Sequence, residues 1–255
     1  MGGVIVDRGL EAALRHDRRV VAASLALVVA LAWLYLWHDA AMMRAMPDMP
    51  RASTAGQFAM AFAMWAVMMV GMMLPSAAPA ILLYGTLVRR HGELGRALPT
   101  AWVFSGGYLA VWTAFSLGAA ALQIALDRAA LLTPMLGSTS TALSAAILAT
   151  AGAYQWLPVK DACLRKCRDP LTFFMTRWRG GRAGAFAMGA EHGVYCLGCC
   201  WALMGVLFVA GVMNLLAVAL IAGFVLVEKL LPASRITSRI AGATLVLAGV
   251  ALLLR

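Results

Sequence analysis

A group of side chains that bind metals lies within a stretch of the chain that is otherwise apolar. Glu191, His192, Cys196, Cys199 and Cys200 fall within ten residues. On a helix the three cysteines stand at i, i+3 and i+4, so their thiols share one face, which His192 extends by one turn. Thiolates with imidazole suit Cu(I), Zn(II) or an iron site, and three such donors without water favour Cu(I). Such groups are costly in lipid, so the spacing predicts a soft-metal site. The alternative is that small cysteines simply pack in the core.

A second pair of cysteines, Cys163 and Cys167, precedes this group and lies in a basic segment. Their Cys-x3-Cys spacing can bring both thiols to one ion on a helical turn. The flanking cations Arg165, Lys166 and Arg168 favour thiolates. We therefore expect this pair either to receive a metal ion on the cytoplasmic side or to be incidental in a basic loop.

Methionine provides the third signal, with 16 residues in the chain. Thioethers are soft, uncharged ligands that select Cu(I), although a methionine stripe at helical spacing is also typical of core packing. Met204 completes the candidate metal ligands. Nine of the 16 fall in two groups, a loop with Met42, Met43, Met46 and Met49, and an apolar run with Met64, Met68, Met69, Met72 and Met73. In that run Met60, Met64, Met68 and Met72 form an i, i+4 ladder that ends near Pro75, where we expect a bend.

One further pair of charges, Glu228 and Lys229, closes an apolar run. We expect Lys229 to extend its ammonium toward the membrane interface, as lysines at helix ends do. Glu228, one turn inside the end of this run, is a weaker candidate for a polar contact with the cysteine group.

The composition indicates which elements must position these residues. With 63% hydrophobic residues, 13% charged residues and a mean hydropathy of +0.84, the chain is too apolar to cover a soluble globule. It predicts an all-α, polytopic transmembrane bundle of about seven helices that forms one domain over residues 1–255. The expected spans of about 20 residues lie near 20–37, 58–84, 99–126, 139–157, 186–211, 213–231 and 240–254. A short boundary near residues 211–214 leaves a six-span alternative open.

The net charge of +10 predicts orientation better than it predicts a partner. Most Lys and Arg residues fall in alternate loops, which places the N-terminus in the cytoplasm and the C-terminus outside. No aromatic-rich polar face is present to stack bases, so we expect no nucleic-acid partner. The first apolar run exceeds the usual length of a signal-peptide core, and we expect a retained helix.

Several motifs together resemble a bacterial family described as predicted metal-binding integral membrane proteins, a domain of unknown function. The resemblance is strongest over residues 58–230 and implies a multi-pass protein of the inner membrane with a metal site. It rests on the segments Trp65–Ser76, Tyr154–Arg168, His192–Met204, Gly211–Asn214 and Glu228–Lys229.

Three function classes follow. The first is a soft-metal protein, most simply for Cu(I), that acts in copper transport or in delivery to a membrane enzyme, with a metallochaperone as a further partner. The second is a transmembrane thiol-disulfide oxidoreductase that uses the Cys-x2-Cys spacing of Cys196 and Cys199. The third is a structural or assembly subunit of a membrane complex that binds haem through His192. Zinc is the alternative metal, and an enzyme is the less expected outcome.

Overall fold

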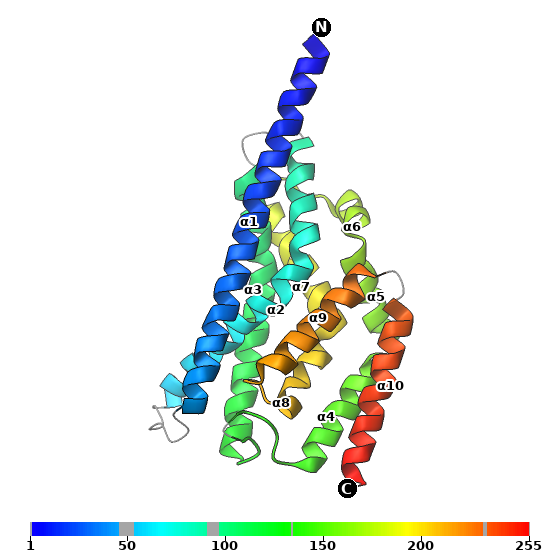
Figure 1. The fold of residues 1–255 in the computed structure, drawn as a ribbon. Helices are drawn as coiled ribbons and strands as arrows, with labels where there is room; N and C mark the ends of the chain where they lie inside the picture. The colour runs from blue at the N-terminus through cyan, green and yellow to red at the C-terminus, as the bar shows by residue number, and fades with distance from the viewer. Residues whose placement is uncertain (1, 46–53, 91–96, 134, 232–233, 255) are drawn as a thin grey trace.

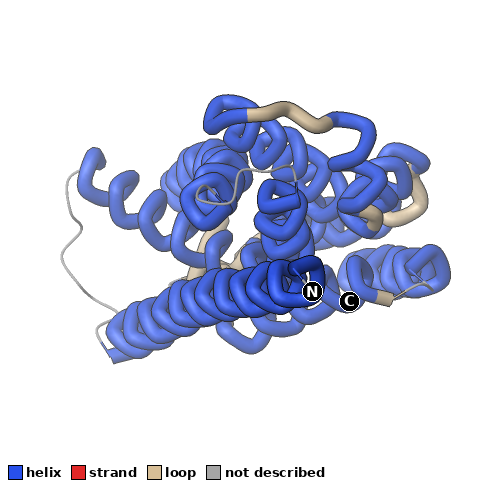
Figure 2. Tube along the Cα trace, turned by 90° about the horizontal axis from the view of Figure 1, so that it is seen from above, coloured by secondary structure: helices blue, strands red, loops and turns tan. Residues whose placement is uncertain are grey.

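A computed structural model describes residues 2–45, 54–90, 97–133, 135–231 and 234–254. The regular structure of the described residues is helical, with one isolated bridge between Leu132 and Ser138 in a loop, and this confirms the all-α prediction (Figures 1 and 2). The helices are α1 (Gly2–Ala45), α2 (Thr54–Arg90), α3 (Ala97–Arg128), α4 (Thr141–Tyr154), α5 (Pro158–Arg168), α6 (Pro170–Arg177), α7 (Gly181–Gly205), α8 (Leu207–Ala210), α9 (Leu215–Leu230) and α10 (Ser234–Leu253).

Five helical segments are long and apolar enough to cross a membrane, which supports the prediction of a membrane protein. A sixth is reached only if α4 and α5, which meet at a bend of 64°, form one broken span. The sixth expected span, near 213–231, is α9, whose 16 residues fall short of the roughly 20 needed to cross. The exact count of seven is therefore not supported. The five segments are Arg18–Ala45, Thr54–Arg89, Leu98–Arg128, Gly181–Ala210 and Arg235–Leu253.

Glycines set how closely the two central helices approach. A Cβ at Gly189 of α7 would lie 1.9 Å from the carbonyl oxygen of Phe104 in α3, and one at Gly107 would lie 2.1 Å from the carbonyl of Phe186. Only residues without a side chain permit this backbone contact. The close packing brings Tyr108 of α3 against the cysteine face of α7.

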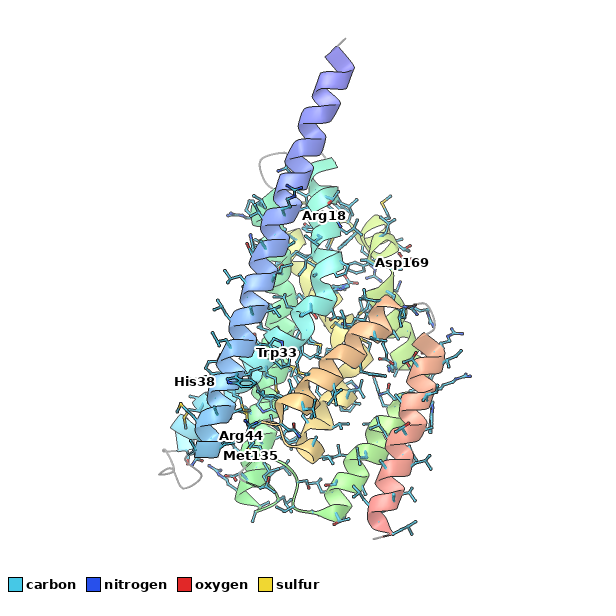
Figure 3. The ribbon with its side chains drawn as sticks, viewed as in Figure 1. Arg18, Trp33, His38, Arg44, Met135 and Asp169 are labelled. Atoms are coloured by element: carbon cyan, nitrogen blue, oxygen red, sulfur yellow. The ribbon has the colours of Figure 1, made fainter. Side chains whose placement is uncertain are left out.

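Proline bends α2 as the sequence predicts, and Figure 1 shows the helix changing direction part-way along its length. Because Pro75 has no N–H, the carbonyl of Gly71 loses its usual helical donor. The indole of Trp33 in α1 donates to that carbonyl at 3.3 Å, and Figure 3 places Trp33 on the side of α1 that faces α2. This contact joins α1 to the bend.

The bend between α4 and α5 has a local cause in the sequence. Pro158 occupies the first turn of α5, and Leu157 before it adopts an extended conformation, as residues before proline do. The change of direction turns the buried face of α5, which carries Lys160, Leu164 and Cys167, toward the centre of the bundle.

Candidate metal centre

The cysteine face predicted on α7 lies in the interior. His192, Cys196, Cys199 and Cys200 are all buried, and α7 runs without a break through them. The thiols of Cys199 and Cys200 donate to the carbonyl oxygen of Cys196 at 3.0 and 3.1 Å. All five cysteines of the chain are free thiols.

The structure adds a fourth thiol from another helix. Cys167 of α5 is buried, and its thiol lies close to those of Cys196 and Cys199. Cys196 in turn contacts the thiols of Cys199 and Cys200. We call Cys167, Cys196, Cys199 and Cys200 the thiol cluster.

Cys163, the other cysteine of α5, packs beside this cluster. Its Sγ would lie 2.6 Å from a Cβ added at Gly198, so the glycine permits α5 to approach α7. Tyr154 at the end of α4 donates to the carbonyl of the same Gly198. The two predicted cysteine groups therefore lie together, although only Cys167 of the α5 pair joins the thiol cluster.

A thioether and a phenol complete one side of the cluster. The Sγ of Cys200 lies 3.9 Å from the Sδ of Met73 in α2. The hydroxyl of Tyr108 lies 3.0 Å from the Sγ of Cys196 and donates to the carbonyl of Met73 at 3.1 Å. Sulfur donors from α2, α5 and α7 thus meet at one place.

Lys229 lies inside the bundle, and the expectation that it reaches the membrane interface is wrong. Its side chain is only 8% exposed, and its Nζ donates to the Sγ of Cys196 at 2.9 Å. The Nζ also donates to the hydroxyl of Ser76 at 2.7 Å, just beyond the bend of α2. The sequence carried no signal that separates this position from an interfacial one, because a lysine at the end of an apolar run is compatible with both.

The neighbouring Glu228 belongs to a second buried network. Lys160 of α5 donates to the Oε1 of Glu228 at 2.6 Å and to the hydroxyl of Ser238 at 3.2 Å, and it also donates to the side chain of Gln155. Lys160 is 0% exposed and Glu228 is 2% exposed. This network ties α5 to α9 and α10, and sequence reasoning missed Lys160 because it lies in a segment that reads as a basic loop.

His192 has no obvious partner for one of its nitrogens. The residue is 3% exposed, and its Nδ1 has no hydrogen-bond partner among the described residues. The rings of Phe104, Tyr108 and Phe173 surround it at centroid distances of 6.1, 6.0 and 5.9 Å. It stands one turn from Cys196, as the helical spacing predicts.

Glu191 lies apart from the thiol cluster. Its carboxylate accepts from Arg177 at 2.8 Å and from the hydroxyl of Tyr195 at 3.2 Å, and Arg179 lies 3.8 Å away. These contacts are on a partly exposed face of α7. As a metal ligand, Glu191 stays a prediction with no contact in its favour.

The methionines divide into buried and peripheral groups. Met60, at the start of the predicted ladder, is 57% exposed, whereas those further along α2 are buried. Met46 and Met49 lie outside the described residues. The buried candidates are Met64, Met68, Met69, Met72, Met73 and Met204.

The cluster is not preassembled around an ion. Among the described residues, no three His, Cys, Asp or Glu side chains stand in a geometry that could hold a metal ion. Two of the thiols are turned toward the carbonyl of Cys196 by their hydrogen bonds. The residues still fit a soft monovalent ion, because such an ion needs few ligands. The thioether of Met73 supplies one further ligand, of a residue type other than His, Cys, Asp or Glu.

One protein family matches most of the chain. The family model described as PpoB2: copper chaperone matches residues 62–252. The chain belongs to this family. No curated protein and no solved structure gives a match. The matched region includes the whole thiol cluster, Met73, Tyr108 and Lys229, so the site lies within the part of the chain that the family shares.

Proposed function

We propose that this protein binds Cu(I) at the thiol cluster together with Met73 and delivers the ion within the membrane. The observation that carries the proposal is the convergence of four buried thiols and one thioether from α2, α5 and α7. Thiolate and thioether sulfurs together select Cu(I) among the common biological metals. The description of the family as a copper chaperone supports the same ion.

The arrangement suits an ion that is held and then released. Cys199 and Cys200 need only rotate about their Cα–Cβ bonds to turn from the Cys196 carbonyl toward an ion. A chaperone exchanges its metal with a partner by ligand substitution, which favours a site with few, movable ligands. Because the site is enclosed by helices, the recipient we propose is a membrane enzyme or a metallochaperone that docks on the bundle.

The proposed route runs along α2. The ladder Met64, Met68 and Met72 leads from the exposed Met60 toward Met73 beside the cluster. Figure 3 places Arg18 and Arg44 at opposite ends of the apolar part of α1, Arg18–Ala45. We propose that the end near Arg18 is cytoplasmic, that the protein crosses the bacterial inner membrane several times, and that the methionines accept copper from the outside.

Loading with copper under reducing conditions tests this proposal. Purified protein in detergent is equilibrated with Cu(I) and the chelator bicinchoninate, and we expect one retained ion per chain with sulfur ligands in X-ray absorption. The double variant Cys196→Ser, Cys200→Ser loses the ion, and Met73→Leu weakens its binding. Met175→Leu is the matched control, because that thioether is 71% exposed and lies in α6, off the proposed route.

Two other results would replace the proposal. A protein that retains no copper, yet shows a reversible disulfide between Cys196 and Cys199 in cells, is a thiol-disulfide carrier. A Soret band that His192→Ala removes identifies a haem protein. Zinc retained in preference to copper at the same thiols refutes the assignment of the metal.

A further inference from the structure

Lys229 places a buried positive charge against the proposed copper ligands. Its Nζ contacts the Sγ of Cys196 and the hydroxyl of Ser76. Among the described residues, no carboxylate lies within ion-pair distance of this ammonium. The adjacent carboxylate, Glu228, is already engaged by Lys160.

A cation in this position requires a compensating negative charge. An ammonium without a counter-charge is costly in the apolar interior of a membrane protein. The nearest groups able to carry negative charge are the sulfurs of the thiol cluster, and Cys196 lies at hydrogen-bond distance. Metal binding makes thiolates, because each ligating thiol loses its proton to water.

The charge of the loaded site depends on the ion and on the number of thiolates. A monovalent ion with two thiolates carries a net charge of −1, which the ammonium of Lys229 cancels. A divalent ion with two thiolates is neutral, and the ammonium leaves the site at +1. A divalent ion reaches neutrality beside Lys229 only by recruiting a third thiolate.

We propose that Lys229 determines the specificity of the site, by balancing a two-thiolate complex of a soft monovalent cation. The two thiolates come from the thiol cluster, and the neutral thioether of Met73 adds a donor without adding charge. This inference rests on the proposed function, since it assumes a metal at these thiols. It goes further in stating why a buried lysine is present and which charge class of metal it admits.

Competition between Ag(I) and Zn(II) on the purified protein tests the role of Lys229. Ag(I) replaces Cu(I) as a redox-inert monovalent probe, and both ions are added to wild type, Lys229→Met and Lys229→Arg. We expect Lys229→Met to lose at least about 30-fold in Ag(I) affinity, the effect of removing about 2 kcal/mol of buried charge pairing. The Zn(II) affinity of Lys229→Met is unchanged or higher, so its preference for Ag(I) over Zn(II) is smaller than that of wild type or is reversed.

Two controls separate charge from structure. Lys229→Arg keeps the charge and retains the preference for Ag(I). Arg182→Met removes an exposed cation at the start of α7, fourteen residues before Cys196 in the chain, and leaves both affinities unchanged. Thermal unfolding of each variant shows whether the chain is folded.

The outcomes distinguish the two proposals. Wild type that binds neither ion at its thiols refutes the proposed function. Wild type that binds Ag(I), with Lys229→Met showing the same preference, leaves the function standing and overturns the role of Lys229. If Lys229→Met does not fold, the wild-type protein provides the test. X-ray absorption then counts the thiolates on Zn(II), and titration compares the Zn(II) and Ag(I) affinities. Zn(II) held by only two thiolates as tightly as Ag(I) overturns the inference, whereas weaker Zn(II) binding supports it.

Discussion

Removing the carboxylate of Glu228 should destabilise the protein more than any comparable surface change. The Glu228→Gln variant keeps the shape of the side chain but leaves the ammonium of Lys160 without its counter-charge. Both residues are almost fully buried, and their ion pair measures 2.6 Å between Nζ and Oε1. Lys160 retains only neutral partners, the side chains of Gln155 and Ser238.

The magnitude follows from the distance and the burial. At an effective dielectric constant of about 20, two unit charges at this separation attract by about 6 kcal/mol. The cost of desolvating both charges offsets much of this attraction, so the intact pair contributes little net stability. Removing the Glu228 charge leaves the desolvation cost of the Lys160 ammonium without the attraction that offset it. We therefore expect Glu228→Gln to lose about 3–5 kcal/mol of unfolding free energy.

A double-mutant cycle measures the effect. Unfolding by sodium dodecyl sulfate in bicelles is followed for wild type, Glu228→Gln, Lys160→Met and the double variant. The double variant should be much closer to wild type than the sum of the single losses, because it removes both charges together. Single losses below about 1 kcal/mol, or losses that simply add, would refute the idea of a buried coupled pair.

Three further predictions concern packing, a side-chain hydrogen bond and a helix cap. Gly189→Leu prevents α3 and α7 from approaching and costs more than about 4 kcal/mol or prevents folding, whereas Gly106→Leu, where a Cβ meets nothing within 4 Å, is tolerated in the same unfolding assay. Trp33→Phe removes the donor to the carbonyl freed by proline in α2 and costs about 1 kcal/mol of unfolding free energy, and a null effect would show that the bend is satisfied otherwise. Asp169→Ala removes the side chain that caps the N-terminus of α6. Hydrogen bonds from Thr172 lower the pKa of this carboxyl group. At pH values above the usual pKa of aspartate, we expect the amides of α6 to exchange faster in this variant, by the equivalent of about 1 kcal/mol of opening free energy. The difference from wild type becomes smaller as the pH falls through the lowered pKa of Asp169, because the protonated side chain caps less well. Equal exchange rates at neutral pH would contradict this role.

Sequence alone determined the features that depend on local periodicity. The apolar runs predicted the long helices, because a helix in lipid must satisfy its own backbone and present apolar side chains. The proline near residue 75 predicted the bend of α2. The i, i+3, i+4 spacing placed three thiols on one face of α7, since 3.6 residues per turn fixes that register. Each of these inferences uses residues within a few turns of one another.

The tertiary structure decided which distant residues meet at that face. Cys167 joins the thiol cluster because α5 bends away from α4 at Pro158. Lys229 contacts Cys196 because α9 is too short to cross and ends beside α7. The sequence pattern around a lysine near a helix end is the same whether its ammonium reaches the membrane interface or is buried inside the bundle. Only the packing of α9 against its neighbours determines which of the two it does, because that packing depends on contacts between residues far apart in the chain.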